Sequence, residues 1–199
     1  MYWKKLLNWP KTSEKSKKNI FIEGKNINLR SKKIEDAELD YKWRVDPELS
    51  ALDATVPINI SLREFRDHLK DEIKYPVPWS VKFGIENKEG VLIGNIMYYD
   101  IDPVDKEAEV GIIIGDREFQ GKGYGTDALI TLKDYIFQET NLENLYLHTL
   151  ITNERARKSF KKAGFSEIGE VRKDGMNFIK MNFKKQMLSN QKIKVCFKP

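Results

Sequence analysis

A glycine-rich turn between a buried strand and an amphipathic helix constrains this chain more than any other stretch of it. Residues 110–114 are apolar and mostly β-branched, which predicts a buried strand, and apolar residues recur at helical spacing over residues 127–139. The turn between them carries Gly121, Gly123 and Gly125. Glycines leave backbone amides uncovered and tolerate positive φ, and a helix N-terminus attracts negative charge. The stretch therefore predicts an anion-binding loop within an α/β fold.

Two common phosphate-binding loops do not match this spacing. A Walker A loop places four residues between its first glycine and a Gly-Lys pair followed by Ser or Thr, whereas five residues separate Gly115 from Gly121. The residue after Lys122 is Gly123, not Ser or Thr. The dinucleotide fingerprint is G-x-G-x-x-G, while these glycines are spaced G-x-G-x-G. Neither family explains the loop.

The segment from Gln120 to Gly125, QGKGYG, resembles the Q/R-x-x-G-x-G/A motif of the GNAT superfamily of acetyl-CoA-dependent N-acetyltransferases. The resemblance extends from about Ile27 to about Lys184, and it is similar to the branch of ribosomal-protein and spermidine acetyltransferases. Further matching stretches occur in the family's order, namely Leu29-Arg30, Glu107 to Ile112, Asn153 to Ala156, and Gly164-Phe165.

The resemblance implies where acetyl-CoA would bind. In this family the central strand's backbone meets the pantetheine and acetyl group, and the loop amides hold the pyrophosphate. Carried over by position, the strand residues are Val110, Ile112 and Ile114, and the loop residues are Gln120, Gly121, Lys122, Gly123, Tyr124, Gly125 and Thr126. No metal is implied, and the sequence has no Cys/His cluster with zinc spacing.

Three residues of the following strand–helix unit also correspond to family positions. Asn153 resembles the asparagine that bonds the pantetheine arm, and it equally fits a plain helix N-cap. Arg155 begins a basic helix that could meet the nucleotide phosphates or be solvated. Phe160 stands where many members carry the tyrosine that protonates the departing thiolate. Another acid could replace it, the thiolate could leave unaided, or catalysis is lost; the candidate acids are water, Tyr98, Tyr99 and Tyr124.

For the base that deprotonates the amine, the alternation of the central strand favours Glu109. Period two puts Glu109 on one face with Gly111 and puts Val110 on the other. Glu107 is the second choice, and pairing of either carboxylate with a neighbouring strand's cation is the plainer interpretation. His148 is an alternative base, because an imidazole titrates near neutral pH, although a single strand histidine is often structural.

The substrate wall implied by the resemblance is formed by the first two helices and the loop between them. Its polar and aromatic candidates are Trp43, Arg44 and Asp46, with Glu48 and Asp53. Trp43 could be core, and Asp46 could simply begin a turn. The acids suit a cationic amine, while Arg44 suits a carboxylate or phosphate-bearing one, so the sequence leaves the amine open.

Patterning along the whole chain predicts an α/β fold with a mixed, mostly antiparallel central sheet and helices on both faces. The resemblance implies that this sheet is splayed at the acyl-CoA site. We expect irregular chain over residues 45–61. The expected elements are a strand pair within 20–30, helices at 34–44, 61–73, 127–139 and after Asn153, strands at 79–85, 91–101, 108–115 and 145–151, and a closing hairpin around Lys173 to Gly175.

Charge divides the 199 residues into three parts, although the whole chain is +5. Residues 1–19 and 184–199 each carry +5, and residues 20–183 carry 24 basic and 29 acidic side chains. We expect a basic flexible N-terminal arm (1–19), an acetyltransferase domain (20–184) and a basic C-terminal tail (185–199). The basic ends could meet an acidic partner or be solvated. The acidic domain has no basic stripe with stacking aromatics, which argues against nucleic-acid recognition.

The alternating segment Ile193 to Phe197 could pair across a homodimer or be a disordered end. A single cysteine excludes an internal disulfide framework, no apolar run approaches a membrane span, and residues 1–10 do not resemble a signal peptide, so a cytoplasmic setting is expected.

The resemblance implies an enzyme that moves an acetyl group from acetyl-CoA to a primary amine by direct transfer in a ternary complex. Small cationic amines, amino sugars and protein N-termini all remain open as substrates. Phe160 and the basic ends motivate an alternative, a non-catalytic acyl-CoA-binding or scaffold module that engages an acidic partner.

Overall fold

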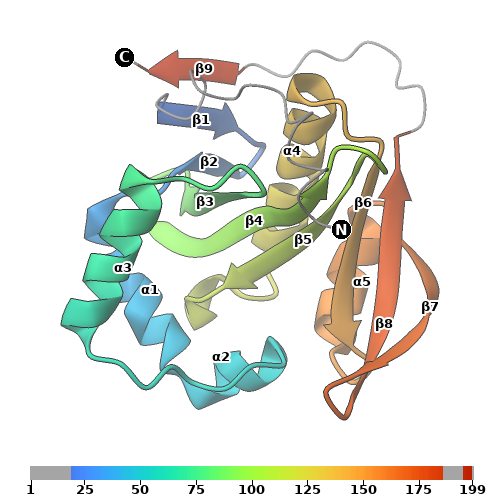
Figure 1. Ribbon diagram of the computed structural model, residues 1–199, viewed down its shortest axis with the longest axis horizontal. Coiled ribbons are helices and arrows are strands. Elements are labelled where there is room, and N and C mark those ends of the chain that lie inside the picture. Colours follow the sequence, from blue (N-terminus) through green and yellow to red (C-terminus); the bar gives the residue numbers. More distant parts are fainter. Residues whose placement is uncertain (1–18, 186–194, 199) are drawn as a thin grey trace.

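The computed structural model describes residues 19–185 and the backbone of residues 195–198. Within them the strands are β1 (Asn19–Glu23), β2 (Ile27–Ser31), β3 (Ser80–Asn87), β4 (Leu92–Asp102), β5 (Glu107–Ile114), β6 (Asn144–Leu150), β7 (Ser166–Lys173), β8 (Met176–Lys184) and β9 (Val195–Lys198). They form one sheet in the order β7-β8-β6-β5-β4-β3-β2-β1-β9 (Figure 1). Only β5 and β6 pair in parallel, so the mixed, mostly antiparallel sheet is confirmed.

The four expected helices are present, together with two short helical elements that were not expected. The helical elements are the 3-10 turns η3 (Ile34–Asp36) and η4 (Arg117–Phe119), and the helices α1 (Ala37–Arg44), α2 (Pro47–Leu52), α3 (Leu62–Lys74), α4 (Tyr124–Glu139) and α5 (Glu154–Lys162). The short turn η4 was not expected, and helix α2 lies where irregular chain was expected, so that prediction was wrong for residues 47–52. The Asp46 side chain accepts hydrogen bonds from the Glu48 and Leu49 amides, and Pro47 occupies the first helical position.

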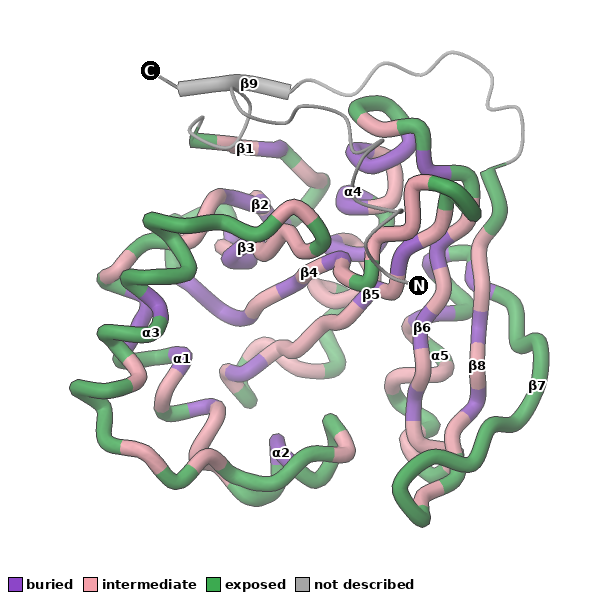
Figure 2. The backbone as a smooth tube through the Cα atoms, in the orientation of Figure 1, coloured by how far each residue is buried: buried purple, intermediate pink, exposed green. Residues whose placement is uncertain are grey.

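Helices cover both faces of the sheet. The large core packs α4 against the strands, and Leu129, Leu132 and Ile136 are almost fully buried in it. A smaller cluster holds Trp43 and Leu49 together with Leu92 and Ile113. Ile112 and Ile114 pack on the large core while Ile113 packs on the small one, so the two cores lie on opposite faces of β5. Burial follows the middle strands and α4, while α3 and β7 are largely exposed (Figure 2).

The sheet opens between its two parallel strands. Strand β5 pairs with β6 only over residues 107–109 against 144–146, whereas it pairs with β4 as far as Ile114. On its other side β6 pairs with β8 along its whole length. Beyond Glu109 and Tyr146 the parallel strands therefore part, and the backbone of residues 110–114 lacks a strand partner on this side (Figure 1). The splay predicted from the sequence is confirmed.

A cluster of buried charges joins β2, η3 and the neighbouring strands on the α1 side. Arg30 makes two hydrogen bonds of 2.7 Å to Asp36 and also contacts Glu86. The Lys32 ammonium lies 3.1 Å from Asp36 and 2.8 Å from Asp40. None of these five side chains is more than 13% exposed. The cluster holds α1 against the strands and so positions the segment leading into α2.

Most of the predicted arm and tail lies outside the described residues. Within the predicted tail, β9 pairs antiparallel with β1, with Ile20 opposite Phe197 and Ile22 opposite Val195. The alternating end of the chain thus has a strand partner within the same chain over residues 195–198. No helix in the described part of the chain is long and apolar enough to cross a membrane.

Candidate functional site

The glycine loop ends at the N-terminus of α4 with its backbone uncovered. Gly121 and Gly123 have φ values of 74° and 89°, and a Cβ built on either would meet no atom within 4 Å. Gly123 is also the N-cap of α4. The Gln120 side chain donates a 2.7 Å hydrogen bond to the carbonyl of Ile114, which fixes the loop to the end of β5. Accessible amides at a helix N-terminus make this an anion-binding geometry.

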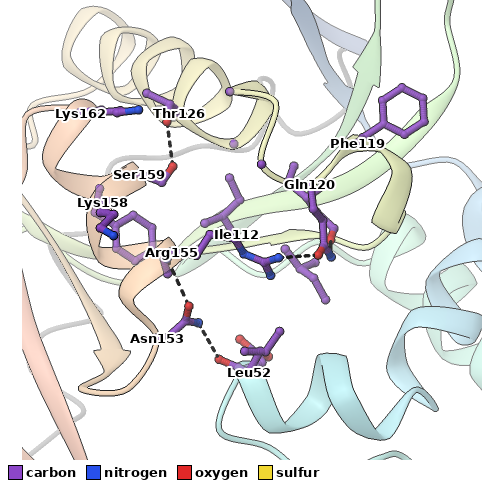
Figure 3. A pocket seen from close by; sticks show the side chains of 18 of the residues that line it. Leu52, Ile112, Phe119, Gln120, Thr126, Asn153, Arg155, Lys158, Ser159 and Lys162 are labelled. Carbon is purple, nitrogen blue, oxygen red and sulfur yellow. Dashed lines mark hydrogen bonds between the residues drawn. The ribbon is translucent and has the colours of Figure 1, made fainter.

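A cavity of about 330 Å³ opens beside the loop, between the end of β5 and α5 (Figure 3). Apolar side chains form its inner wall, including Ile112, Ile114 and Phe160. Its outer part is polar. The remaining lining residues are Leu49, Leu52, Asp53, Ile113, Phe119, Gln120, Gly121, Gly123, Gly125, Thr126, Asn153, Arg155, Ala156, Lys158, Ser159 and Lys162. The site therefore combines an apolar slot with a polar, positively charged rim.

Helix α5 presents one cationic face to this cavity. Arg155, Lys158 and Lys162 line it, and their spacing of three and four residues puts them on one side of the helix. Arg155 reaches across to the loop and donates a 2.7 Å hydrogen bond to Gln120 Oε1 (Figure 3). Arg157 and Lys161 are instead paired with Glu167, each at 3.0 Å. Three of the basic side chains of α5 therefore face the cavity, and two others form ion pairs with Glu167.

Asn153 joins α5 to α2. Its Oδ1 accepts a 3.2 Å hydrogen bond from the Ala156 amide, as an N-cap does, and its Nδ2 lies 3.4 Å from the Leu52 carbonyl (Figure 3). Thr126 at the start of α4 and Ser159 of α5 share a 2.8 Å hydrogen bond. The first cavity is therefore bounded by parts of the chain that hydrogen bonds tie together.

A second cavity of about 330 Å³ adjoins the first. Six residues line both, namely Leu52, Asp53, Ile112, Asn153, Ala156 and Phe160. The second cavity is reached by Glu109, Val110 and Gly111 of β5, by Tyr99 of β4, and by the end of β6. Its other lining residues are Ala54, Thr55, His148, Thr149, Leu150, Lys173, Asp174, Met176 and Phe178. The separation of β5 from β6 thus leaves two adjoining cavities that share a wall, which we call the first and second chambers.

Glu109 and His148, two of the predicted catalytic residues, are in contact in the second cavity. The Nδ1 atom of His148 lies 2.8 Å from Glu109 Oε1. Tyr99 lies opposite Glu109 in the β4–β5 register. Burial, the Glu109 charge and a side-chain hydrogen bond to Glu109 all raise the pKa of Tyr99. These three side chains lie together at the chamber wall. The strand–helix–strand order of residues 108–151 was the available signal for a parallel pairing of β5 with β6, but not for this contact.

Five further predicted residues line neither cavity. Tyr124 packs its ring against Phe119, with centroids 5.5 Å apart, and lines neither cavity. Lys122 is exposed at the loop tip. Trp43 is core, 5% exposed, and a Cβ on Gly115 would lie only 2.0 Å from its ring. Arg44 pairs with Asp53 at 3.6 Å, and Asp46 caps α2 and pairs with Arg117 at 2.8 Å.

Of the five residues proposed for the substrate wall, Asp53 alone lines the cavities. Leu52, Asp53 and Thr55 at and beyond the end of α2 line the chambers. Desolvation raises the pKa of Asp53, and the nearby Arg44 charge opposes that rise. The Asp46-Pro47 pair was the available signal, because an N-cap followed by proline favours a new helix and not merely a stop.

In the described residues, no group of three or more His, Cys, Asp or Glu side chains could hold a metal ion.

Known proteins of similar sequence belong to the family that the sequence motifs indicated. Residues 26–166 match the family described as acetyltransferase (GNAT) domain. The chain is 36% identical over 88 residues to a putative ribosomal N-acetyltransferase, YdaF, of Bacillus subtilis, covering 44% of this chain and 47% of that protein. It is 33% identical over 90 residues to a spermidine N(1)-acetyltransferase of Vibrio cholerae, covering 45% and 51% respectively.

Solved structures share the fold. The crystal structure of spermidine N-acetyltransferase from Vibrio cholerae in complex with CoA and spermine superposes with a TM-score of 0.70 at 23% identity, covering 80% of this chain and 95% of that one. A ribosomal L7/L12 α-N-protein acetyltransferase, RimL, also gives 0.70, at 15% identity, covering 83% and 95%.

The open sheet, the glycine loop and the match over residues 26–166 define the class of protein, and the chain belongs to the GNAT acetyltransferase family. It spans about half the length of the curated relatives that it matches.

Proposed function

We propose that this protein is an N-acetyltransferase that moves an acetyl group from acetyl-CoA to a primary amine by direct transfer in a ternary complex. The observation that carries the proposal is the pair of adjoining chambers at the parting of β5 and β6. One chamber has an anion-binding loop and the other has a hydrogen-bonded carboxylate and imidazole. Two substrates could therefore meet at the shared wall without a covalent enzyme intermediate.

The first chamber fits coenzyme A. The uncovered amides of Gly121 and Gly123 and the helix N-terminus would hold the pyrophosphate, and Gln120 keeps the loop in place. Arg155, Lys158 and Lys162 would meet the remaining phosphate charge. The apolar slot at Ile112 and Ile114 would take the pantetheine arm, which Asn153 could also bond. Bound there, acetyl-CoA supplies an acetyl thioester, whose carbonyl the unpaired backbone of β5 can polarise.

The second chamber fits the amine. An amine attacks a thioester only when neutral, and the contacting Glu109 and His148 side chains are the proposed proton-accepting unit. The carboxylates of Asp53, Glu109 and Asp174 line this chamber and favour a cationic amine. Spermidine acetylation is what several relatives are named for, so a small cationic amine is our preferred substrate, ahead of an amino sugar or a protein N-terminus.

Departure of the thiolate has no dedicated acid at residue 160, because Phe160 has no proton to donate. Its ring lies on the wall common to the two chambers. A thiol has an ordinary pKa of about 8.5, so a thiolate is a tolerable leaving group near neutral pH. We propose that it leaves without a side-chain acid, and that Tyr124 supports the loop through Phe119.

Four further expectations remain predictions that belong to the same proposal. We place the reaction in the cytoplasm, with no nucleic acid and no metal taking part. A homodimer is compatible with this function.

Thermal-shift titration with acetyl-CoA and desulfo-CoA, followed by thiol-release assays against polyamines, amino sugars and peptide N-termini, tests the proposal. A ligand at 100 times its Kd stabilises the folded state by about 2.7 kcal/mol, so the melting temperature should rise. We expect thiol release with at least one amine class, strongest with polyamines.

A blocked variant makes the assay specific. In Gly125→Leu the new side chain would point at Ile114 and Ile112 and fill the first chamber. Gly125→Ala adds only a Cβ at 3.6 Å or more from its neighbours and is the matched control. We expect the Leu variant alone to lose binding and turnover. Binding without turnover on any amine would favour the scaffold alternative, and absence of binding would refute both.

A further inference from the structure

The Glu109 carboxylate already has a hydrogen-bond partner within the protein. Its Oε1 atom accepts a 2.8 Å hydrogen bond from His148 Nδ1, and Tyr99 lies opposite it in the β4–β5 register. The Glu109 side chain is 13% exposed, compared with 23% for His148. Of these two side chains, both of which line the second chamber, the imidazole is therefore the more exposed. A carboxylate already hydrogen-bonded to an imidazole is also less free to meet an incoming amine.

The contact with Glu109 decides which imidazole nitrogen carries the hydrogen. A carboxylate can only accept, and a neutral imidazole has one donor and one acceptor nitrogen. Nδ1 is therefore the donor, and Nε2 keeps its lone pair. Within the described residues, Nε2 makes no hydrogen bond. The ring is held edge-on by Tyr146 and Phe178, with centroids 5.8 and 6.5 Å away, so its orientation is set on both sides.

We infer that Nε2 of His148 is the atom that takes the proton from the amine, and that Glu109 and Tyr99 are positioning residues. This inference rests on the proposed function. It assigns Glu109 a different role from the one that strand alternation suggested, because the sequence could not reveal that Glu109 and His148 touch. Carboxylate-oriented histidines act as bases in other hydrolytic and transfer reactions by the same physical logic.

The charges around the imidazole are mixed. Glu109 on β5 contacts it directly, and Lys180 on β8 lies opposite it in the register. The Lys180 ammonium is 4.4 Å from the Tyr146 ring centroid. The other titratable groups of the chamber are Tyr99 of β4, Lys173 and Asp174 at the β7–β8 turn, and Asp53 after α2. The direct hydrogen bond makes Glu109 the dominant partner, and it stabilises the imidazolium formed by proton transfer.

The proposed acetyl transfer moves two protons and exchanges one bond. One proton passes from the substrate ammonium to Nε2, and the freed nitrogen lone pair forms a bond to the acetyl carbon. The carbon–sulfur bond breaks, with its electron pair leaving on sulfur. A second proton is lost from the nitrogen and protonates the thiolate through solvent. The imidazolium then returns its proton to water at the open end of the chamber.

Nitrogen NMR tests the tautomer without requiring turnover. The chain has two histidines, and His68 lies on the exposed surface of α3. His68→Gln therefore leaves His148 as the one labelled ring and should not change activity. At a pH where the ring is neutral, we expect the signature of a protonated Nδ1 and an unprotonated Nε2. Glu109→Ala should reduce that preference. A protonated Nε2 in the native protein would overturn the inference.

Chemical rescue tests the role in catalysis. His148→Ala should lower kcat/KM by about 100-fold or more, the usual contribution of a general base. Added imidazole should restore part of the loss in this variant and not in Glu109→Ala. The acid limb of the pH profile should persist in Glu109→Ala and vanish in His148→Ala.

The opposite pattern would overturn the inference and return the role to Glu109. In that case formate would rescue Glu109→Ala, and His148→Ala would keep both its rate and its acid limb. If wild-type protein binds acetyl-CoA and turns over no amine, the proposed function fails. The NMR measurement would still show which nitrogen of His148 carries the hydrogen.

Discussion

At the scale of single residues, the buried charges around Arg30 show how much depends on partners. Asp36 is 4% exposed and accepts hydrogen bonds from Arg30 and from the Lys33 amide. Burial would raise the pKa of Asp36, but the Arg30 hydrogen bond, the Lys32 charge and the Lys33 amide outweigh it, so the pKa lies below its ordinary value of 3.8. A buried ion pair is weak evidence of net stability, but removing one partner leaves an uncompensated charge.

We predict that Asp36→Asn lowers the free energy of unfolding by about 3 kcal/mol at pH 7. Because the folded pKa of Asp36 is depressed, its contribution is fully present above the unfolded pKa and is lost as pH falls through the folded value. The difference between wild type and variant should therefore be constant above about pH 5 and shrink below it. Urea unfolding at several pH values measures it.

An exposed ion pair is the matched control for this variant. Glu72 pairs with Lys82 at 2.9 Å, with side chains 58% and 35% exposed. Solvent screens such a pair, so Glu72→Gln should change the free energy of unfolding by less than about 1 kcal/mol. Equal effects of the two substitutions would contradict the role assigned to the buried cluster.

At the scale of elements, the turn into α4 depends on backbone that only glycine adopts easily. Gly123 caps the helix with φ of 89°, a left-handed conformation that costs other residues about 1–2 kcal/mol. The same conformation aims the loop amides outward. Stability and anion binding thus depend on one short segment.

Gly123→Ala should lower the melting temperature by about 2–4 °C per kcal/mol of strain for a chain of this size, and should weaken acetyl-CoA binding. Gly169 on β7 is the control, because it has no positive φ and a Cβ there would meet nothing within 4 Å. Gly169→Ala should leave both quantities nearly unchanged. Differential scanning calorimetry measures the melting temperature, and a titration with acetyl-CoA measures the affinity. Similar shifts in the two variants would contradict the role assigned to the left-handed backbone at Gly123.

Helix α2 shows how a six-residue element can organise a site. Asp46 and Glu48 at its start pair with Arg117, at 2.8 and 2.9 Å, and so connect it to the segment that leads into the glycine loop. At its other end the Leu52 carbonyl meets Asn153. The helix thus spans the parted strands and brings Leu52 and Asp53 to both chambers.

At the scale of the whole molecule, the sheet extends to a strand from the far end of the sequence. Residues 195–198 continue it beyond β1, so β1 is an inner strand although it begins at residue 19 (Figure 1). An inner strand has backbone partners on both sides, whereas an edge strand can template self-association.

A chain ending at Lys185 should therefore be less stable, by about 1 kcal/mol per backbone hydrogen bond lost, and should associate more readily. Urea unfolding and sedimentation velocity measure the two effects. We expect the loss of stability to be independent of protein concentration, because the pairing is within one chain. A dimeric full-length protein that becomes monomeric on truncation would instead mean that the strand pairs across subunits.

The sequence by itself determined the local structure and the family. Alternation placed the strands and the glycine spacing identified the loop, because each signal lies within a few neighbouring residues. The Ser61–Glu64 capping box begins α3 at the start of the helix expected over residues 61–73. The sequence analysis missed α2, which lies in the stretch expected to be irregular.

Only the tertiary structure decided which residues meet. Glu109 and His148 are 39 positions apart, and their contact depends on the three-residue parallel pairing of β5 with β6. Among the substrate-wall candidates, Trp43 packs against Gly115 and Asp46 caps α2, so neither lines a chamber. Asp53, another candidate, lines both chambers. Non-local strand pairing and competition for partners have no local signature, so the chemistry of the site was decided by the fold.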